Sequence, residues 1–155
     1  MQRLWSFLER PAPVRASFDD VLLAIQHPHM CLINTLPANE QGCLIAGTLP
    51  HDQEEEVMNG LLDAGDTRTH FVVYGRNSTD TTVVTKAEQL LELGFAPERV
   101  LVYAGGMFEW VLLQDVYGTE TFVTTTKVKD LLVFSRPTRT AHPSKLYLTF
   151  HGNGP

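Results

Sequence analysis

Residues 71–80, Phe-Val-Val-Tyr-Gly-Arg-Asn-Ser-Thr-Asp, are the stretch that decides the fold of this chain. The run from His70 to Tyr74 is almost entirely made of β-forming residues, which is typical of a strand buried on both faces of a parallel sheet. Gly75 ends this run, and a polar loop leads into a helix that we expect over roughly residues 82–93. A buried strand followed by a loop and a helix predicts an α/β fold. Because ligands of such folds bind beyond the carboxyl ends of the strands, we expect a site at this loop.

The alternation of strands and helices continues on both sides of this stretch. A second buried strand precedes the pair Gly105-Gly106, which turns the chain into another helix, and upstream Ser17 begins a helix that Pro28 ends. The expected elements are strands at residues 30–34, 70–74 and 100–103, short extended segments at 44–45 and 122–125, and helices between residues 17 and 28, 52 and 65, 82 and 93, 108 and 117, and 127 and 134. This order predicts a roughly five-stranded, mainly parallel sheet with helices on both faces.

The length of 155 residues fits a single domain with an extension at each end. Prolines break any helix begun near the start of the chain, so residues 1–16 are expected to form an arm. Residues 17–135 contain the alternating elements and form the domain. Residues 136–155 are interrupted by proline and glycine and are expected to be an irregular extension. A β-like pattern within this extension would suit the groove of a partner protein. Its apolar side chains are Leu146, Tyr147, Leu148 and Phe150.

Composition narrows the classes of function. The net charge of −6 argues against nucleic-acid binding, because phosphate recognition requires a basic patch. No apolar stretch is long enough to cross a membrane or to form a signal peptide, so we expect no membrane contact and a cytoplasmic, reducing setting. Cys31 and Cys43 are expected to be free thiols and not a disulfide. No histidine has metal-ligand spacing with either cysteine, so no metal and no other cofactor is expected.

Four further segments, together with residues 71–80, form a pattern of motifs along the chain. They are Cys-Leu-Ile-Asn at 31–34, Ile-Ala-Gly-Thr-Leu-Pro at 45–50, Leu-Leu-Glu-Leu-Gly-Phe at 90–95 and Gly-Gly-Met-Phe-Glu-Trp at 105–110. Their order and spacing resemble the rhodanese-like family of sulfurtransferase domains. In that family the active-site strand ends in a tyrosine or a similar residue, and a cysteine, an arginine and small polar residues follow. The resemblance covers roughly residues 17–117 and implies one rhodanese-like domain.

The sequence departs from this family at the residues that would carry its chemistry. The resemblance implies a thiolate at the first loop position, which attacks a sulfur donor and carries the sulfur as a persulfide, but Gly75 stands there. Arg76 matches an arginine of the family, whereas Asp80 stands where a second arginine is usual and brings a negative charge to the mouth of the anion-binding loop. Asn34 and Leu36 replace the usual aspartate and arginine of an upstream element. We therefore expect no catalytic residue in the degenerate loop formed by Gly75, Arg76, Asn77, Ser78, Thr79 and Asp80.

The leading hypothesis is a catalytically inactive rhodanese-like domain that acts as a protein-interaction or regulatory module. Its partner would be another protein or a second copy of the chain. The contacting surface would be the loop, the unusually apolar helix of residues 108–117, or the C-terminal extension.

Three alternatives stay open on the sequence alone. The first is a thiosulfate or persulfide sulfurtransferase that uses a non-standard cysteine, Cys43 or Cys31. The second is a hydrolase that uses the hydroxyl of Ser78 or Thr79, although a hydroxyl nucleophile needs an adjacent base and no histidine lies near in sequence. The third is a small-anion sensor that binds without turnover through the loop N–H groups, Arg76, Ser78 and Thr79. Phosphatase chemistry on this fold would also need the missing cysteine.

Overall fold

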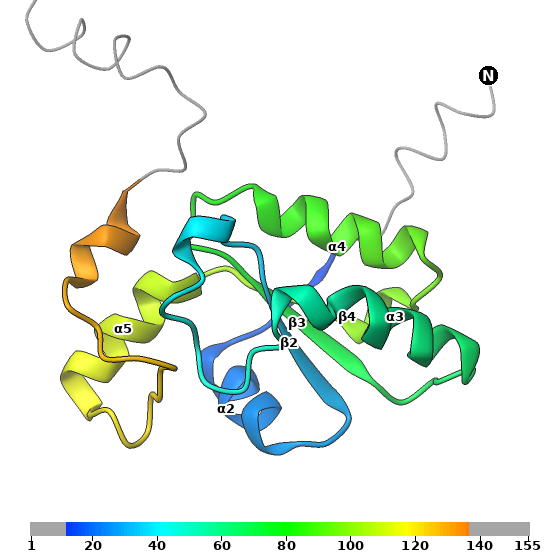
Figure 1. Ribbon diagram of the computed structural model, residues 1–155, viewed down its shortest axis with the longest axis horizontal. Helices are drawn as coiled ribbons and strands as arrows, with labels where there is room; N and C mark the ends of the chain where they lie inside the picture. The colour runs from blue at the N-terminus through cyan, green and yellow to red at the C-terminus, as the bar shows by residue number, and fades with distance from the viewer. Residues whose placement is uncertain (1–11, 137–155) are drawn as a thin grey trace, which may run out of the picture.

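A computed structural model describes residues 12–136, which form an α/β fold (Figure 1). Its elements are β1 (Val14–Arg15), α2 (Phe18–Gln26), β2 (Met30–Asn34), η1 (Ala38–Glu40), η2 (His51–Gln53), α3 (Glu54–Asp63), β3 (His70–Tyr74), α4 (Thr82–Glu92), η3 (Pro97–Arg99), β4 (Val100–Tyr103), α5 (Gly106–Tyr117) and η4 (Leu131–Ser135). No helix in this described part of the chain is long and apolar enough to cross a membrane. Most of the expected arm and extension lies outside the described residues, including Leu146, Tyr147, Leu148 and Phe150.

The four strands form one parallel sheet in the order β1-β4-β3-β2. All of β3 pairs with β2, and at their carboxyl ends Tyr74 lies opposite Asn34. Tyr74 also lies opposite Tyr103 of β4. Three strands therefore end at the same level, and the loops that follow them meet at one edge of the sheet.

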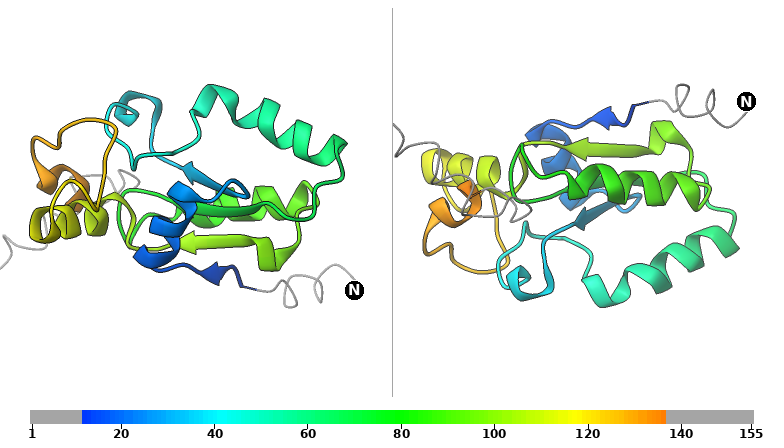
Figure 2. Two further views of the ribbon diagram at one scale, coloured as in Figure 1. Left: turned by 90° about the horizontal axis from the view of Figure 1, so that it is seen from below. Right: turned by 90° about the horizontal axis from the view of Figure 1, so that it is seen from above.

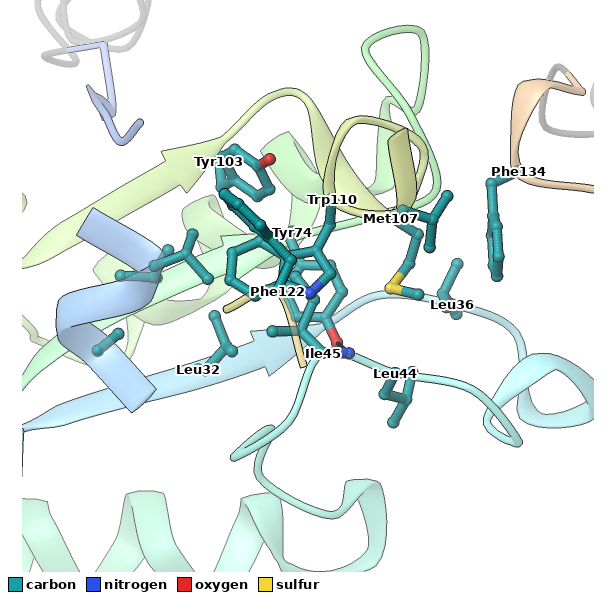
Figure 3. Close-up of a cluster of buried hydrophobic side chains, with 14 residues drawn as sticks. Leu32, Leu36, Leu44, Ile45, Tyr74, Tyr103, Met107, Trp110, Phe122 and Phe134 are labelled. Carbon is teal, nitrogen blue, oxygen red and sulfur yellow. Dashed lines mark hydrogen bonds between the residues drawn. The ribbon is translucent and has the colours of Figure 1, made fainter. Parts of the chain in front are cut away.

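Successive strand residues point to opposite faces of the sheet, and a pair of helices covers each face. Val72 and Tyr74 pack in an apolar cluster with α2 and α5, whereas Phe71 and Val73 pack with α3 and α4. Figure 1 shows α2 and α4 on opposite sides of the strands, and Figure 3 shows the first cluster, with Tyr74 at its centre. Burial on both faces explains why residues 71–74 carry large, mostly apolar side chains without a break.

The strands predicted at residues 30–34, 70–74 and 100–103 are confirmed with the same bounds. The predicted N-cap is confirmed as well, because the Ser17 side chain accepts from the Asp20 N–H in a capping box at the start of α2. The last helix expected, between residues 127 and 134, is instead the short 3₁₀ turn η4. Asp130 caps this turn and a proline follows it closely, which leaves no room for a longer helix.

Within residues 12–136 the sheet has four strands, where the sequence predicted roughly five. The expected extended segment at residues 44–45 makes only an isolated bridge, between Ile45 and Thr124. Gly47 follows with a φ of 79°, and this turn ends the segment before a strand can form. In contrast, β1 is a strand that the sequence analysis assigned to the N-terminal arm. It pairs with Leu101 and Val102 at the edge of the sheet.

The amino end of α5 lies directly against the loop that follows β3. The Met107 N–H donates to the Gly75 carbonyl and the Phe108 N–H donates to the Arg76 carbonyl, both at 2.9 Å. Gly106 has a φ of 60°, and a Cβ at this position would lie 2.5 Å from the Gly75 carbonyl oxygen. Only glycine fits at position 106, because the positive φ and the close backbone contact both exclude a side chain.

We expect Gly106→Ala to lower the free energy of unfolding by about 3 kcal/mol, since the new methyl group meets backbone atoms that cannot move aside. Gly60→Ala is the matched control, because Gly60 lies within α3 and a Cβ there would meet nothing within 4 Å. This control should raise the free energy of unfolding by about 0.5–1 kcal/mol. Urea unfolding followed by circular dichroism measures both. Similar values for the two variants would contradict the close approach of α5 to the loop.

Candidate functional site

The loop of residues 75–80 lies at the carboxyl end of β3, between the ends of β2 and β4, where the sequence placed the site. Its backbone is fixed on one side by the two hydrogen bonds from α5. On the other side it continues into α4, whose first N–H group, that of Thr82, donates to the Asp80 side chain. Figure 2 shows this end of the molecule, where α5 and the orange C-terminal turn lie beyond the strand ends in both views.

The side chain of Asp80 fills the space that a side chain at position 75 would occupy. A Cβ added to Gly75 would lie 2.4 Å from Oδ2 of Asp80 and 2.8 Å from its Cγ. The same Oδ2 accepts a hydrogen bond from the Arg76 N–H at 2.9 Å. Oδ1 accepts from the N–H of Thr82 at 3.0 Å and from its hydroxyl at 2.6 Å. Asp80 is only 5% exposed, so its charge lies inside the loop. The expectation that this charge lies at the mouth of the loop is wrong.

The guanidinium group of Arg76 is also held within the protein. Its Nη2 contacts both carboxylate oxygens of Glu40, a residue of η1. The Arg76 side chain is 8% exposed and that of Glu40 is 29% exposed. Because this pair is largely shielded from water, its charges attract each other more strongly than those of a surface pair. The one cation of the loop is therefore neutralised by the chain itself.

Asn77 joins the loop to the end of the described chain. Its Nδ2 donates to the carbonyl of Phe134 at 2.7 Å and to the carbonyl of Arg136 at 2.9 Å. Its Oδ1 accepts from the N–H and the hydroxyl of Thr79. The Phe134 ring is buried in the apolar cluster near Leu36 (Figure 3). The C-terminal turn is thus attached to the loop by a buried amide and a buried ring.

The other positions singled out by the sequence have structural partners or face solvent. Ser78 and Thr79 are exposed, and the Thr79 hydroxyl donates to the Asn77 amide oxygen, which is not a base. Asn34 exchanges hydrogen bonds with Gln41 and accepts from the Leu36 N–H, so it fixes the turn after β2. Among residues 12–136, no hydrogen bond joins the hydroxyl of Ser78 or Thr79 to an adjacent base, which a hydroxyl nucleophile requires.

The two cysteines lie on different elements. Cys31 is on β2 and lies opposite Phe71 of β3. Phe71 precedes Gly75 by four residues, so Cys31 lies roughly 13 Å from the loop along the strand direction. Burial and the nearby Glu54 carboxylate raise the pKa of Cys31 from 9.0 to about 11, so this thiol stays protonated at neutral pH. Cys43 directs its Sγ to the carbonyl oxygen of Thr126 at 3.7 Å. Neither sulfur occupies the position of a side chain at residue 75.

The arrangement as described holds neither a nucleophile nor a metal-binding cluster. Among residues 12–136, no group of three or more His, Cys, Asp and Glu side chains gathers in a way that could hold a metal ion. The Arg76 N–H of the loop and the Thr82 N–H of α4 both donate to the buried Asp80 carboxylate. Its chemistry is that of an internally neutralised, closely packed turn.

The loop could be located from the sequence, but most of the residues that contact it could not. Glu40 lies 36 positions from Arg76 in sequence, and Phe134 lies 57 positions from Asn77. Pairs so far apart leave no periodic signal in one sequence. The bond between Asp80 and the Thr82 N–H is different, because an aspartate that accepts from the N–H two residues later is a recognised local turn pattern.

A scan against models of known protein families finds no match to this sequence, and a search of the curated proteins finds none either. Solved structures do match the fold. A yeast protein tyrosine phosphatase of the rhodanese family matches with a TM-score of 0.55 and 20% identity, over 79% of this chain and 99% of that one. The BH2092 protein from Bacillus halodurans matches with a TM-score of 0.52 and 16% identity, over 76% of this chain and 80% of that one. These likenesses show that the chain has the rhodanese-like α/β fold, as expected from its motifs.

The rate of alkylation by iodoacetamide tests whether the Cys31 thiol is protonated at neutral pH. A rise in pKa of about two units lowers the thiolate fraction at pH 8 by roughly 100-fold. In the Cys43→Ser variant, where Cys31 is the only thiol, we expect alkylation at least about tenfold slower than that of free cysteine. The rate should rise with pH up to about 11. Cys31→Ser, which leaves only Cys43, is the control. A Cys31 rate that levels off below pH 9 would contradict the buried, protonated thiol.

Proposed function

We propose that this protein is a catalytically inactive rhodanese-like domain that acts as a protein-interaction or regulatory module. The observation that carries the proposal is the interior of the loop, where Gly75 offers no nucleophile and the Asp80 carboxylate fills the space of the missing side chain. A sulfurtransferase or a cysteine-dependent phosphatase needs a thiolate at that point. Here the position holds an anionic group that cannot take up sulfur or a phosphoryl group as a thiolate does.

The alternatives are less well supported by the geometry. A relocated sulfur carrier at Cys31 would need a thiolate, and the pKa of Cys31 is raised to about 11. Cys43 lies beside the carbonyl of Thr126 and not among the N–H donors of the loop. An anion sensor based on Arg76, Ser78 and Thr79 would have to displace Glu40 from Arg76. The activity of the yeast phosphatase therefore does not carry over to this chain.

The outer face of α5 is the surface best suited to a protein partner. Leu112, Val116 and Tyr117 are 39%, 70% and 68% exposed. Residues four apart lie on one face of a helix, so Leu112 and Val116 form the centre of an apolar stripe. Beside it lies a hollow of about 870 Å³ between α5 and residues 118–131. An apolar stripe next to a concave surface is the kind of patch that proteins use for association.

Sulfur transfer from thiosulfate and from 3-mercaptopyruvate to cyanide tests the absence of activity. We expect no thiocyanate above the buffer rate from the wild type. Gly75→Cys should also remain inactive, because its Cβ would meet the Asp80 carboxylate and that negative charge disfavours a thiolate. Wild-type turnover that is lost in Cys43→Ser or in Cys31→Ser would contradict the proposal and would identify the thiol responsible.

Sedimentation equilibrium of the full chain tests the α5 surface with a second copy as the partner. We expect the wild type to self-associate, and Val116→Glu to weaken the association at least about tenfold, because it buries a charge in the apolar stripe. Val84→Glu is the matched control, since Val84 is 46% exposed on α4, over the opposite face of the sheet. A wild type that stays monomeric, or equal effects of both variants, would contradict association through α5.

A further inference from the structure

We infer that the Asp80 carboxylate is a built-in ligand of the loop, which excludes small oxyanions such as sulfate from a binding site that the loop otherwise still forms. The inference rests on the proposed absence of catalysis. It adds a second reason for that absence, because an anionic substrate could not bind while the carboxylate occupies the loop. It assigns Asp80 a role beyond that of a helix cap.

The first step is the position of the carboxylate. Oδ2 accepts from the Arg76 N–H at the start of the loop, and Oδ1 accepts from the Thr82 N–H in the first turn of α4. A loop N–H group and the amino end of an eleven-residue helix are the donors that commonly bind an anion. The two oxygens of one carboxylate thus occupy donors that would otherwise bind two oxygens of a sulfate.

The second step is the space. Without a side chain at residue 75, the loop would contain a void, and the Asp80 carboxylate fills it, with its Oδ2 2.4 Å from the position of the missing Cβ. At 5% exposure this group is buried, so its charge must be balanced by the surrounding donors. A ligand from solution would therefore have to displace a group that is tethered at a high effective concentration.

The third step is unused binding capacity. Among the described residues, Nε of Arg76 is a buried donor with no hydrogen-bond partner. Its Nη2 contacts Glu40, which neutralises the charge. The loop thus keeps a donor without a partner beside the Arg76 and Thr82 N–H groups, so a small anion could be stabilised there once the Asp80 carboxylate is removed.

The test compares two substitutions of Asp80 that differ in volume. Asp80→Ser retains a side chain that can cap α4 but leaves the interior of the loop empty. Asp80→Asn removes the charge and keeps the volume, so the site should stay filled. Sodium sulfate is titrated into the ¹⁵N-labelled full chain at pH 7, with sodium chloride used to hold the ionic strength constant. The amide signals of Arg76 and Thr82 are followed, and the melting temperature is measured in parallel.

We expect saturable shifts of both amide signals in Asp80→Ser only, together with a rise in its melting temperature beyond the general effect of sulfate on the wild type. Saturable shifts in the wild type would overturn the inference, because the carboxylate would then not exclude the anion. An unresponsive Asp80→Ser would overturn it as well, because Asp80 would then be a helix cap alone. Neither result depends on sulfur transfer, so failure here and failure of the proposed function are distinguishable.

Discussion

The two backbone hydrogen bonds from the start of α5 to the carbonyls of Gly75 and Arg76 are the contact on which the functional end of this protein depends. They hold the loop after β3 against the helix after β4, and the absence of a side chain on Gly106 makes that distance possible. α5 in turn packs against η4, so the C-terminal turn is positioned by the same contact. Backbone atoms alone form these two hydrogen bonds, so this contact does not itself use a side chain at position 75.

The sequence was sufficient to predict the elements that depend on local pattern. Continuous β-type runs predicted β2, β3 and β4 with correct bounds, because a strand buried on both faces must be apolar throughout. The two-residue strand β1 could not be predicted, since its pairing with β4 depends on a register that only the assembled sheet defines. The extended segment expected at 44–45 makes only an isolated bridge, because the turn at Gly47 ends it.

The position of the loop at the end of β3 could be predicted from the sequence, but the contacts of its side chains could not. The sequence shows a glycine at position 75 and an acidic residue at position 80, and the charge of Asp80 was expected at the mouth of the loop. The sequence could not show that Asp80 turns inward, because that direction depends on the empty volume beside Gly75. The partners of Arg76 and Asn77 come from η1 and from the end of η4, both far away in sequence. Such contacts follow from the fold and not from the spacing of residues.

The missing nucleophile and the inward carboxylate are one structural change and not two. A side chain at position 75 would overlap the carboxylate, and without it the interior of the loop would hold a void beside buried N–H donors, each of which is costly when unpaired. Asp80 fills the void and satisfies those donors together. The interior of the loop is therefore packed, and its buried N–H donors are paired within the chain. If the proposed absence of catalysis holds, the same packing that closes the loop leaves the outer surfaces of the domain as the place where a partner would bind.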